Sequence, residues 1–509
     1  MLARVKSGLL IGIDAHLVTL EIDLSKSGIP SFRMVGLPEG AVKESKDRVF
    51  TALKNLGFKV PSCRITVNLA PADVKKEGSS YDLPLAVGIL CALEKISPTI
   101  LENAIFAGEL SLNGQLQPIP GALPLAVMAR EMKIKNLYLP RKNAIEASVV
   151  DEIDCYGIDS FLDLIESLSG KKSLNPVKTN IEDLWSDREK FLIDFEEVKG
   201  QSHAKRAIEI AAAGAHNLLF IGPPGSGKTM LAQRIPTVLP LLEFDEALEV
   251  TKIYSVSGLL QDRPIIINRP FRAPHHTISD AGLIGGGRYP LPGEVSLAHK
   301  GVLFLDELPE FKKHVLEVLR QPLEDGKVTI SRASMTITYP AEFMLVAAMN
   351  PCPCGYLGDK KHVCICTPAQ IQRYKSKLSG PLLDRIDLHV EVSAVPYEEL
   401  KQKKGGVSSK QMRDRIVKAR NLQKQRYKGL PFSTNSKLSG KYLSEFCSLG
   451  TKEHKFLENA VNKLGLSARA YTKILRIART IADLEQSPII ELNHLAEAIG
   501  YRSLDRNYL

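Results

Sequence analysis

One octapeptide constrains the fold of this chain more than any other part of its sequence. The run Gly-Pro-Pro-Gly-Ser-Gly-Lys-Thr occupies residues 222–229, directly after the strand-like stretch Asn217–Ile221 and before a helical pattern that begins near Met230. Glycines at this spacing let backbone N–H groups wrap a phosphate chain, while the lysine reaches the terminal phosphates and the threonine hydroxyl ligates magnesium. The sequence therefore predicts an α/β nucleotide-binding domain. The residues expected around the nucleotide are Gly222, Pro223, Pro224, Gly225, Ser226, Gly227, Lys228, Thr229 and Met230.

An acidic pair supplies the second part of a hydrolytic site. Val302–Leu305 is a run of four apolar residues that ends in Asp306 and Glu307. Alone, such a run is common as a core strand with a polar exit, but the phosphate loop upstream gives the two carboxylates a role. Asp306 is predicted to hold Mg²⁺ together with Thr229, and Glu307 to orient or deprotonate the attacking water. The sequence thus predicts an ATP hydrolase with ATP and Mg²⁺ as cofactors.

The length of 509 residues suggests about three domains. Apolar residues make up 44% of the chain and charged residues 24%, the mixture of an ordinary globular protein. No apolar run reaches the roughly 20 residues that cross a bilayer, and we see no signal peptide, so a cytoplasmic protein without membrane contact is expected. The expected segments are an α/β domain over residues 1–170, a polar linker over 171–194, an ATPase core over 195–395, a basic segment over 396–438 and a helical lid over 439–509.

Much of the formal net charge of +10 lies in one segment. Residues 401–430 contain eleven basic side chains and the single acid Asp414. Such a segment suits a polyanion, which it would bind through phosphate contacts and counterion release. The alternative is a solvated helix face or a mobile linker. The basic residues are Lys401, Lys403, Lys404, Lys410, Arg413, Arg415, Lys418, Arg420, Lys424, Arg426 and Lys428.

Four of the eight cysteines crowd into residues 352–366. They form two Cys-x-Cys pairs, so that one short loop delivers four thiolates to a tetrahedral zinc ion. We predict a structural Zn²⁺ site there, with His362 as a substitute ligand and free surface thiols as the alternative. The predicted ligands are Cys352, Cys354, Cys364 and Cys366.

Two further positions resemble parts of the AAA+ ATPases. The strand-like run Phe343–Met349 ends in Asn350, which resembles their sensor asparagine if this strand lies beside the acidic one. Residues 195–201 resemble the segment that lies against the adenine base, and this makes Gln201 a candidate nucleotide contact.

Two arginines have candidate roles by the same resemblance. Arg385 resembles the arginine finger that a neighbouring subunit inserts to neutralise charge in the transition state, which would make hydrolysis depend on oligomers. A salt bridge with Asp384 or Asp387 is the alternative. Arg469 resembles the second sensor in the helical lid, although Arg476 and Arg479 lie nearby. A plain helix-face arginine is the alternative for Arg469.

Two insertions narrow the class. Residues 327–338 read as two short strands around a turn at 332–334, which resembles the pre-sensor hairpin of ring motors such as magnesium chelatase and the minichromosome-maintenance helicases. Such hairpins project into the central channel of a ring, where Lys327 and Arg332 would grip phosphates. His275 and His276 lie in the other insertion and are either channel contacts or packed loop residues.

The order of these motifs resembles the ComM/YifB family of magnesium chelatase-like AAA+ proteins over nearly the whole chain. The resemblance implies an α/β fold in which a Lon-protease-like or ribosomal S5-like domain precedes an AAA+ P-loop core with a helical lid. It also implies a homo-hexameric helicase that binds DNA and moves branched DNA during natural transformation, with recombination proteins as partners. The alternative is a chelatase-like remodeller that acts on a protein.

The Lon-like resemblance raises the question of proteolysis. Ser80 falls where the Lon-type nucleophile would lie, and a serine nucleophile needs a general base. The later segment Ile119–Leu125 contains no lysine to serve as that base. We therefore expect a scaffold without peptidase activity.

Overall fold

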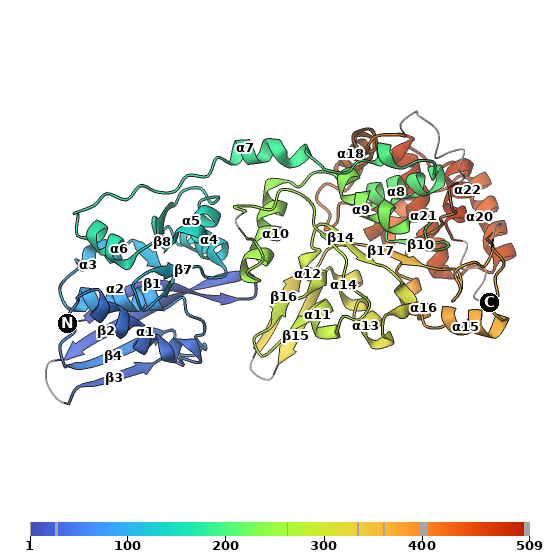
Figure 1. Cartoon of the computed structure of the whole chain (residues 1–509). Helices are drawn as coiled ribbons and strands as arrows, with labels where there is room; N and C mark the ends of the chain where they lie inside the picture. Colours follow the sequence, from blue (N-terminus) through green and yellow to red (C-terminus); the bar gives the residue numbers. More distant parts are fainter. Residues whose placement is uncertain are drawn as a thin grey trace. The chain divides into compact units, whose positions relative to one another are not determined.

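Apolar strand-forming runs of the sequence gather into two separate main sheets (Figure 1). The computed structural model describes residues 2–25, 29–261, 263–332, 335–359, 362–395 and 406–502. The chain divides into unit 1, formed by Met1–Asp187 and Phe244–Ile267, and unit 2, formed by Arg188–Glu243 and Asn268–Leu509. Both units combine helices with a sheet, so the predicted α/β class is confirmed.

Unit 1 is built on a seven-stranded sheet in the order β3-β4-β2-β1-β5-β8-β9. Strands β1 and β2 pair antiparallel, whereas β5, β8 and β9 run parallel. Every residue of helix α2 is buried, which explains why its sequence is apolar on all sides. The strands are β1 Leu2–Ile11, β2 Asp14–Ser25, β3 Ser31–Val35, β4 Arg64–Ala70, β5 Ala104–Phe106, β6 Glu109–Leu110, β7 Leu116–Gln117, β8 Asn136–Pro140 and β9 Asp154–Ile158. The helices are α1 Ala41–Asn55, α2 Asp82–Ala92, α3 Pro98–Leu101, α4 Ala122–Glu131, α5 Arg141–Ala147, α6 Phe161–Leu168, α7 Ile181–Ser186 and α10 Phe244–Val256.

Helix α10 packs in unit 1, although the sequence analysis assigned its residues to the ATPase core. Leu248 lies against the apolar cluster under helix α4, and the Gly121 amide donates to the Ser255 carbonyl at 3.1 Å. The ring of Trp185 meets that of Phe244 edge-on at 5.9 Å. Residues 244–267 are therefore an excursion of the chain from the ATPase fold into the N-terminal one.

Unit 2 contains a five-stranded parallel sheet. The predicted phosphate loop follows the carboxyl end of β10, an inner strand of that sheet. The strand order is β11-β14-β17-β10-β18. Strands β10, β14 and β17 are buried along their whole length, as expected for strands covered on both faces. The strands of unit 2 are β10 Leu218–Ile221, β11 Phe271–Arg272, β12 Gly285–Gly286, β13 Leu291–Pro292, β14 Val302–Leu305, β15 Lys327–Arg332, β16 Met335–Pro340, β17 Met344–Met349 and β18 Leu388–Glu391.

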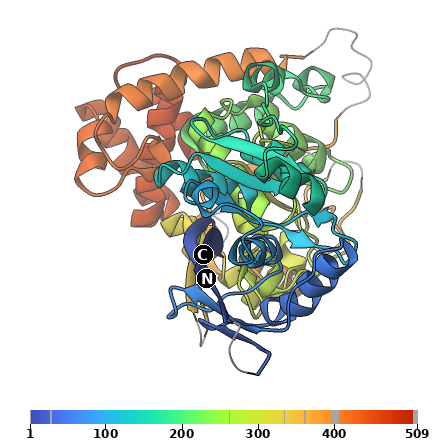
Figure 2. The ribbon, with the colours of Figure 1, turned by 90° about the vertical axis from the view of Figure 1, so that its left-hand side faces the viewer.

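Helices pack against this sheet. The C-terminal helices form a bundle, drawn orange to red in Figure 2. The predicted helical spacing in the lid is confirmed, because Ile474, Ile477 and Ile481 of α21 are all buried. The helices are α8 Ser202–Gly214, α9 Lys228–Val238, α11 Asp280–Ile284, α12 Glu294–Leu297, α13 Lys313–Glu317, α14 Arg320–Asp325, α15 Pro368–Lys375, α16 Gly380–Leu383, α18 Ser409–Arg426, α19 Lys441–Phe446, α20 Thr451–Leu464, α21 Ala468–Leu484 and α22 Leu492–Gly500.

Candidate active site

The phosphate loop joins the end of β10 to the start of α9, and its glycines are needed for that path. A Cβ on Gly222 would lie 2.1 Å from the carbonyl oxygen of Val392, and Gly225 and Gly227 have φ angles of 73° and 89°. L-residues rarely adopt such angles. The hydroxyl of Ser226 is buried and has no hydrogen-bond partner within the described part of the chain. The loop therefore has a backbone path that suits phosphate binding, and the Ser226 hydroxyl is available as a further hydrogen-bonding group.

Lys228 and Asn350 meet at the mouth of this loop. The Lys228 ammonium donates to the carbonyl of Gly222 at 2.7 Å and to Oδ1 of Asn350 at 3.2 Å. Strand β17, which ends at Asn350, lies between β10 and β14. The expected adjacency of the asparagine strand and the acidic strand is thus confirmed. Burial lowers the pKa of Lys228, and the charge of Asp306 acts in the opposite direction.

The residues expected to hold magnesium also meet. The Thr229 hydroxyl donates to Oδ2 of Asp306 at 2.7 Å, which places a hydroxyl and a carboxylate side by side at the end of β14. Oxygen donors of this kind suit Mg²⁺, which binds one or two protein oxygens and keeps several waters. The donor set therefore fits the ion, which would act there as a Lewis acid on the phosphates.

Glu307 lies next to an unexpected partner. Its carboxylate Oε2 is 3.2 Å from Nδ1 of His276, and its backbone adopts the left-handed conformation with φ 51° and ψ 46°. The ring of His276 lies 4.0 Å from that of His275, centroid to centroid. His276 is thus part of the active-site wall. Sequence reasoning missed this position because His276 and Glu307 are 31 positions apart in the chain.

Gln201 lies against the phosphate loop. It caps α8 with a left-handed backbone, and its side-chain amide donates to the carbonyl of Ser226 at 3.3 Å and to that of Ser393 at 2.6 Å. Met230 follows the loop on α9 and is 36% exposed. Gln201 therefore ties the loop to the segment after β18.

The two predicted arginines lie in the same part of unit 2. Arg385 forms an ion pair with Glu324 and donates to the carbonyl of Pro381 at 2.7 Å, so its partner is neither of the two aspartates considered from the sequence. Arg469 donates to Asp384 at 2.6 Å. Burial, together with the nearby charges of Arg320 and Arg469, lowers the pKa of Arg385.

The other lid arginines differ from Arg469 in exposure. Arg479 is buried against Asp483, with its Nε 3.1 Å from Oδ1, whereas the side chain of Arg469 is 69% exposed. An arginine held inside the bundle cannot reach a nucleotide without unfolding it. Arg469 is therefore a better second-sensor candidate than Arg479.

The four clustered cysteines converge. Their sulfur atoms all lie within 4.8 Å of one another, and Sγ of Cys352 is 3.3 Å from that of Cys354 and 3.7 Å from that of Cys364. A tetrahedral zinc ion with Zn–S bonds of about 2.3 Å needs sulfurs about 3.8 Å apart. Backbone hydrogen bonds, first from Tyr356, lower the pKa of Cys354 to about 6, whereas the pKa values of Cys364 and Cys366 are raised by desolvation and the adjacent sulfurs. The set fits a zinc ion.

The cysteine-rich loop, residues 352–366, contacts the phosphate loop. A Cβ on Gly355 would lie 2.6 Å from Cδ of Pro224. The side chain of His362 is 61% exposed and stands 3.6 Å from Asp359, and it is not part of the sulfur cluster. The four cysteines alone therefore form the candidate zinc site, directly after Asn350.

The predicted hairpin is present as β15 and β16, which pair antiparallel from Lys327↔Pro340 to Arg332↔Met335. Lys327 and Arg332 are exposed, while turn residues 333 and 334 lie outside the described residues. A second, smaller hairpin of β12 and β13 has the exposed residues Arg288 and Tyr289 at its tip, and the guanidinium lies 5.7 Å from the ring centroid. These two residues were missed, although the run Gly-Gly-Gly-Arg-Tyr marks a turn with a basic and an aromatic side chain.

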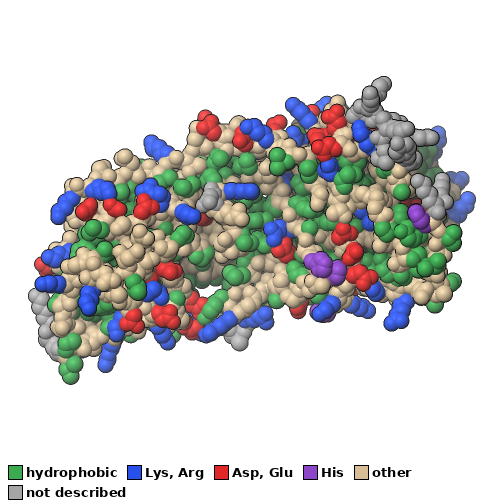
Figure 3. Space-filling view, in the orientation of Figure 1, with side chains coloured by type: hydrophobic (Ala, Val, Ile, Leu, Met, Phe, Trp, Pro, Cys, Tyr) green, Lys and Arg blue, Asp and Glu red, His purple; other side chains and the backbone are tan. Residues whose placement is uncertain are grey.

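Part of the basic segment packs inside unit 2. Residues 396–405, with Lys401, Lys403 and Lys404, lie outside the described residues, but 409–426 form helix α18, which packs against α8, α9 and α21. Several of its basic side chains hydrogen-bond or pair inside unit 2. The contacts are Arg413 with the Thr237 carbonyl, Arg415 with Glu209, Arg420 with the Ala212 carbonyl, Lys424 with Glu243 and Arg426 with Asp483. Five of the eleven basic side chains of residues 401–430 therefore contact groups inside unit 2. On the face seen in Figure 3, basic and acidic side chains are interspersed.

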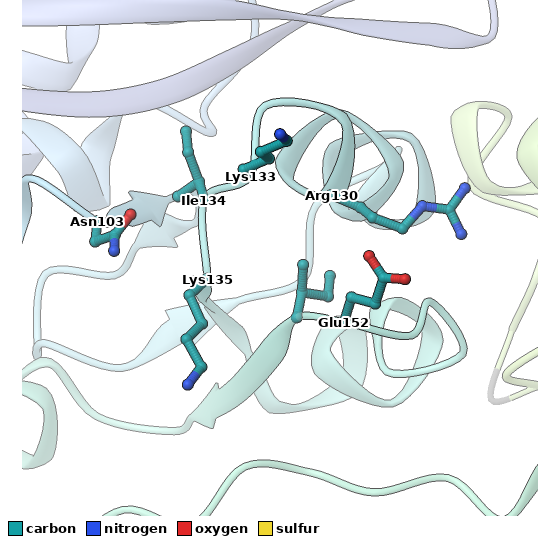
Figure 4. A pocket seen from close by; sticks show the side chains of 7 residues that line it. Asn103, Arg130, Lys133, Ile134, Lys135 and Glu152 are labelled. Atoms are coloured by element: carbon teal, nitrogen blue, oxygen red, sulfur yellow. The ribbon is translucent and has the colours of Figure 1, made fainter.

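Two features of unit 1 bear on other activities. Lys76, the lysine nearest to Ser80 in the chain, is buried and donates to the carbonyl of Val74 at 2.6 Å, so its ammonium is already bound. A cavity of about 300 Å³ lies beside Arg130, Lys133 and Lys135. These three side chains point in different directions (Figure 4) and do not converge on one anion. Within the described residues, the structure has no helix long and apolar enough to span a membrane.

Comparison with known proteins agrees with this geometry. Three models of magnesium chelatase subunit ChlI match the chain, one over residues 20–143, one over 194–400 and a C-terminal one over 406–502. Competence protein ComM of Haemophilus influenzae is 48% identical over 99% of this chain and 98% of its own length. YifB of Escherichia coli is 44% identical over 97% of this chain and 96% of its own length.

The chain belongs to the ComM/YifB family. The family carries the AAA-type chelatase domain, which implies ATP hydrolysis. Lon protease 2 of Bacillus subtilis is 28% identical over 25% of this chain and 22% of its own length, so part of the chain is similar to a Lon protease. The ComM/YifB assignment thus covers both units.

Proposed function

We propose that this ComM/YifB protein is the subunit of a homo-hexameric ring ATPase that moves along DNA and promotes branch migration during natural transformation. The observation that carries the proposal is the pair of hairpins in unit 2. Arg332 on β15 and Arg288 beyond β12 are exposed, and Tyr289 beside Arg288 is 39% exposed. Arginine binds phosphates, and an exposed aromatic ring stacks on bases.

Similarity to ComM supports the same role, since ComM is named a competence protein and the similarity spans 99% of this chain and 98% of ComM. Such a role would place the protein in the cytoplasm, with DNA and recombination proteins as partners. The assembled ring would bring Arg385 to the nucleotide of the adjacent subunit, where a cation neutralises charge in the transition state.

Several α18 cations are paired inside unit 2, and the proposal therefore assigns the DNA contacts to the hairpins. We therefore expect a modest salt dependence, set by a few phosphates per subunit, since the logarithm of the affinity falls by about 0.7–0.9 per phosphate contact for each tenfold rise in salt. Lys327→Ala and Arg332→Ala would each reduce this slope.

The deciding experiment is an ATPase titration with single-stranded, duplex and branched DNA, with particle size recorded in the same samples. The proposal requires that DNA stimulates hydrolysis and that ATP brings subunits together into a ring. An active hexamer that fails to move strands on forked DNA would reject the helicase role.

The second candidate is a chelatase-like remodeller that acts on a protein. It is favoured by the matches to magnesium chelatase models over three segments and by the internal pairing of α18. ATPase rate and particle size that stay the same with and without DNA would select it over the DNA translocase.

A further inference from the structure

We propose that Lys473 of the lid is a positioning residue for Arg385, because it fixes the two residues that follow this arginine. The inference rests on the proposed function, in which Arg385 acts on the nucleotide of the adjacent subunit, and it names how that arginine is held in place. Lys473 lies on α21, four residues after Arg469, and its side chain is only 7% exposed.

The Lys473 ammonium contacts two consecutive residues of the core. It donates to the carbonyl of Ile386 at 2.9 Å and lies 3.4 Å from Oδ1 of Asp387. Both residues are buried. Removal of one partner from a buried ion pair leaves the other charge uncompensated, so such a pair holds its groups in one arrangement. The backbone directly after Arg385 is therefore fixed from the side of the lid.

Asp387 also joins the lid to the residues that precede β10. Its Oδ2 accepts from the backbone amide of Asn217 at 3.3 Å and lies 3.4 Å from Nδ1 of His216. The other ring nitrogen of His216 lies 2.8 Å from the Thr480 hydroxyl on α21. Burial acts to raise the pKa of Asp387, but Lys473 and then His216 outweigh it and hold this pKa well below its usual range. The carboxylate is therefore charged and bound from both sides.

The core sheet and the C-terminal residues hold the same stretch of backbone. The Asn217 side-chain amide donates to the carbonyl of Arg385 at 2.8 Å, and its Oδ1 accepts from a backbone amide of β17 at 2.9 Å. Arg502 donates to the carbonyls of Ile386 and Asp387 at 2.8 and 3.1 Å. Every backbone carbonyl from Arg385 to Asp387 thus accepts a side-chain hydrogen bond.

This anchoring contrasts with the contacts of the Arg385 guanidinium. It donates to the carbonyl of Pro381 at 2.7 Å and forms an ion pair with Glu324, whose side chain is 58% exposed. An ion pair with so exposed a carboxylate contributes little, so the guanidinium can exchange Glu324 for a phosphate while its backbone stays in place. A misplacement of about 1 Å at a catalytic group costs about 100-fold in rate. The fixed backbone therefore sets how well the arginine completes a neighbouring site.

The test is a double-mutant cycle in ATP hydrolysis with Lys473→Met, Arg385→Ala and the two substitutions combined. Methionine keeps an unbranched apolar side chain and removes both contacts. We expect Lys473→Met to lower kcat about ten- to a hundredfold, with unchanged binding of a fluorescent ATP analogue. The combined variant should be no slower than Arg385→Ala alone, because a residue that acts through Arg385 then has nothing left to position. Lys473→Arg keeps the charge and should recover most of the rate.

Arg479→Met is the matched control. Arg479 is a buried cation on the same helix and pairs with Asp483 at 3.1 Å, so its loss disturbs the lid without touching the residues after Arg385. Its melting transition should fall, whereas its kcat should stay near the wild-type value. Melting and particle size are recorded for each variant. If Lys473→Met does not fold, Lys473→Gln, which is uncharged and one bond shorter, takes its place.

Mixed rings separate this proposal from the action of Arg385 across subunits. Lys473→Met subunits should regain activity with Lys228→Ala subunits but not with Arg385→Ala subunits, because only the former supply a well-placed arginine. A wild-type rate in Lys473→Met, or a further fall when it is added to Arg385→Ala, overturns the positioning role. If Arg385→Ala and Lys228→Ala subunits do not complement each other, the proposed action across subunits fails, whereas the double-mutant cycle still decides whether Lys473 acts through Arg385.

Discussion

Replacing Asp483 by asparagine should destabilise unit 2 by about 3 kcal/mol. Asp483 is fully buried and accepts hydrogen bonds from Arg426 at 2.9 Å, Asn435 at 2.8 Å and Arg479 at 3.1 Å. The side chains of the two arginines are 21% and 3% exposed, so the substitution leaves buried cations without a counter-ion. Breaking a buried pair costs about 3–5 kcal/mol, and asparagine still accepts one hydrogen bond, which puts the loss at the lower end.

Calorimetry of the full chain measures this loss. At about 2 °C per kcal/mol for a unit of this size, the unit 2 transition should fall by about 6 °C. Hydrogen exchange should increase in peptides from α18 and α21. Asp414→Asn is the matched control, because Asp414 is an exposed aspartate on the same basic helix, and it should change stability by less than about 0.5 kcal/mol.

One outcome would refute the structural role of the basic helix. If its charge serves a polyanion instead, Arg426→Gln would leave the melting transition in place and lower the salt slope of DNA binding by about one. We expect the reverse result for Arg426→Gln, a lower transition and an unchanged slope.

Three further predictions concern the candidate active site. Lys228→Ala should lose binding of a fluorescent ATP analogue, whereas Glu307→Gln should keep binding and lose about 10²–10⁴-fold in phosphate release; equal hydrolysis by Glu307→Gln and wild type would remove that residue from its role. Metal analysis should find one zinc ion per chain, less in Cys352→Ser but the same in His362→Ala; a metal-free preparation with full activity would contradict a functional site. Mixed Arg385→Ala and Lys228→Ala subunits should recover part of the ATPase activity that each lacks alone, and an inactive mixture would count against Arg385 acting across subunits.

Local motifs predicted which strand ends meet at the candidate nucleotide site. The phosphate loop, the acidic pair and Asn350 each follow a strand, and the carboxyl ends of parallel strands meet at one sheet edge. The register of β14 with β17 confirms that meeting. The Cys-x-Cys pairs likewise implied a shared centre, since two short turns place four sulfurs together, and the sulfurs do cluster.

Partners far along the chain were beyond reach of such patterns. The positive charge of α18 suggested a free surface, because its acidic partners lie elsewhere: Glu209 is about 200 residues before Arg415, and Asp483 lies in the lid. For the same reason the sequence pointed to neighbouring aspartates for Arg385 rather than Glu324. The charge composition of a segment does not show which distant residues will pair with its side chains.

The excursion of α10 has a consequence for how the protein is made. Helix α10, which begins at Phe244, completes the apolar cluster around α4. During synthesis, the ribosome therefore translates the whole phosphate loop before unit 1 can finish folding. A truncated chain that stops at Asp187 would leave the apolar side of α4 in water, and it should be captured by chaperones or aggregate. The N-terminal unit therefore has to be expressed together with at least the part of the chain that extends through α10.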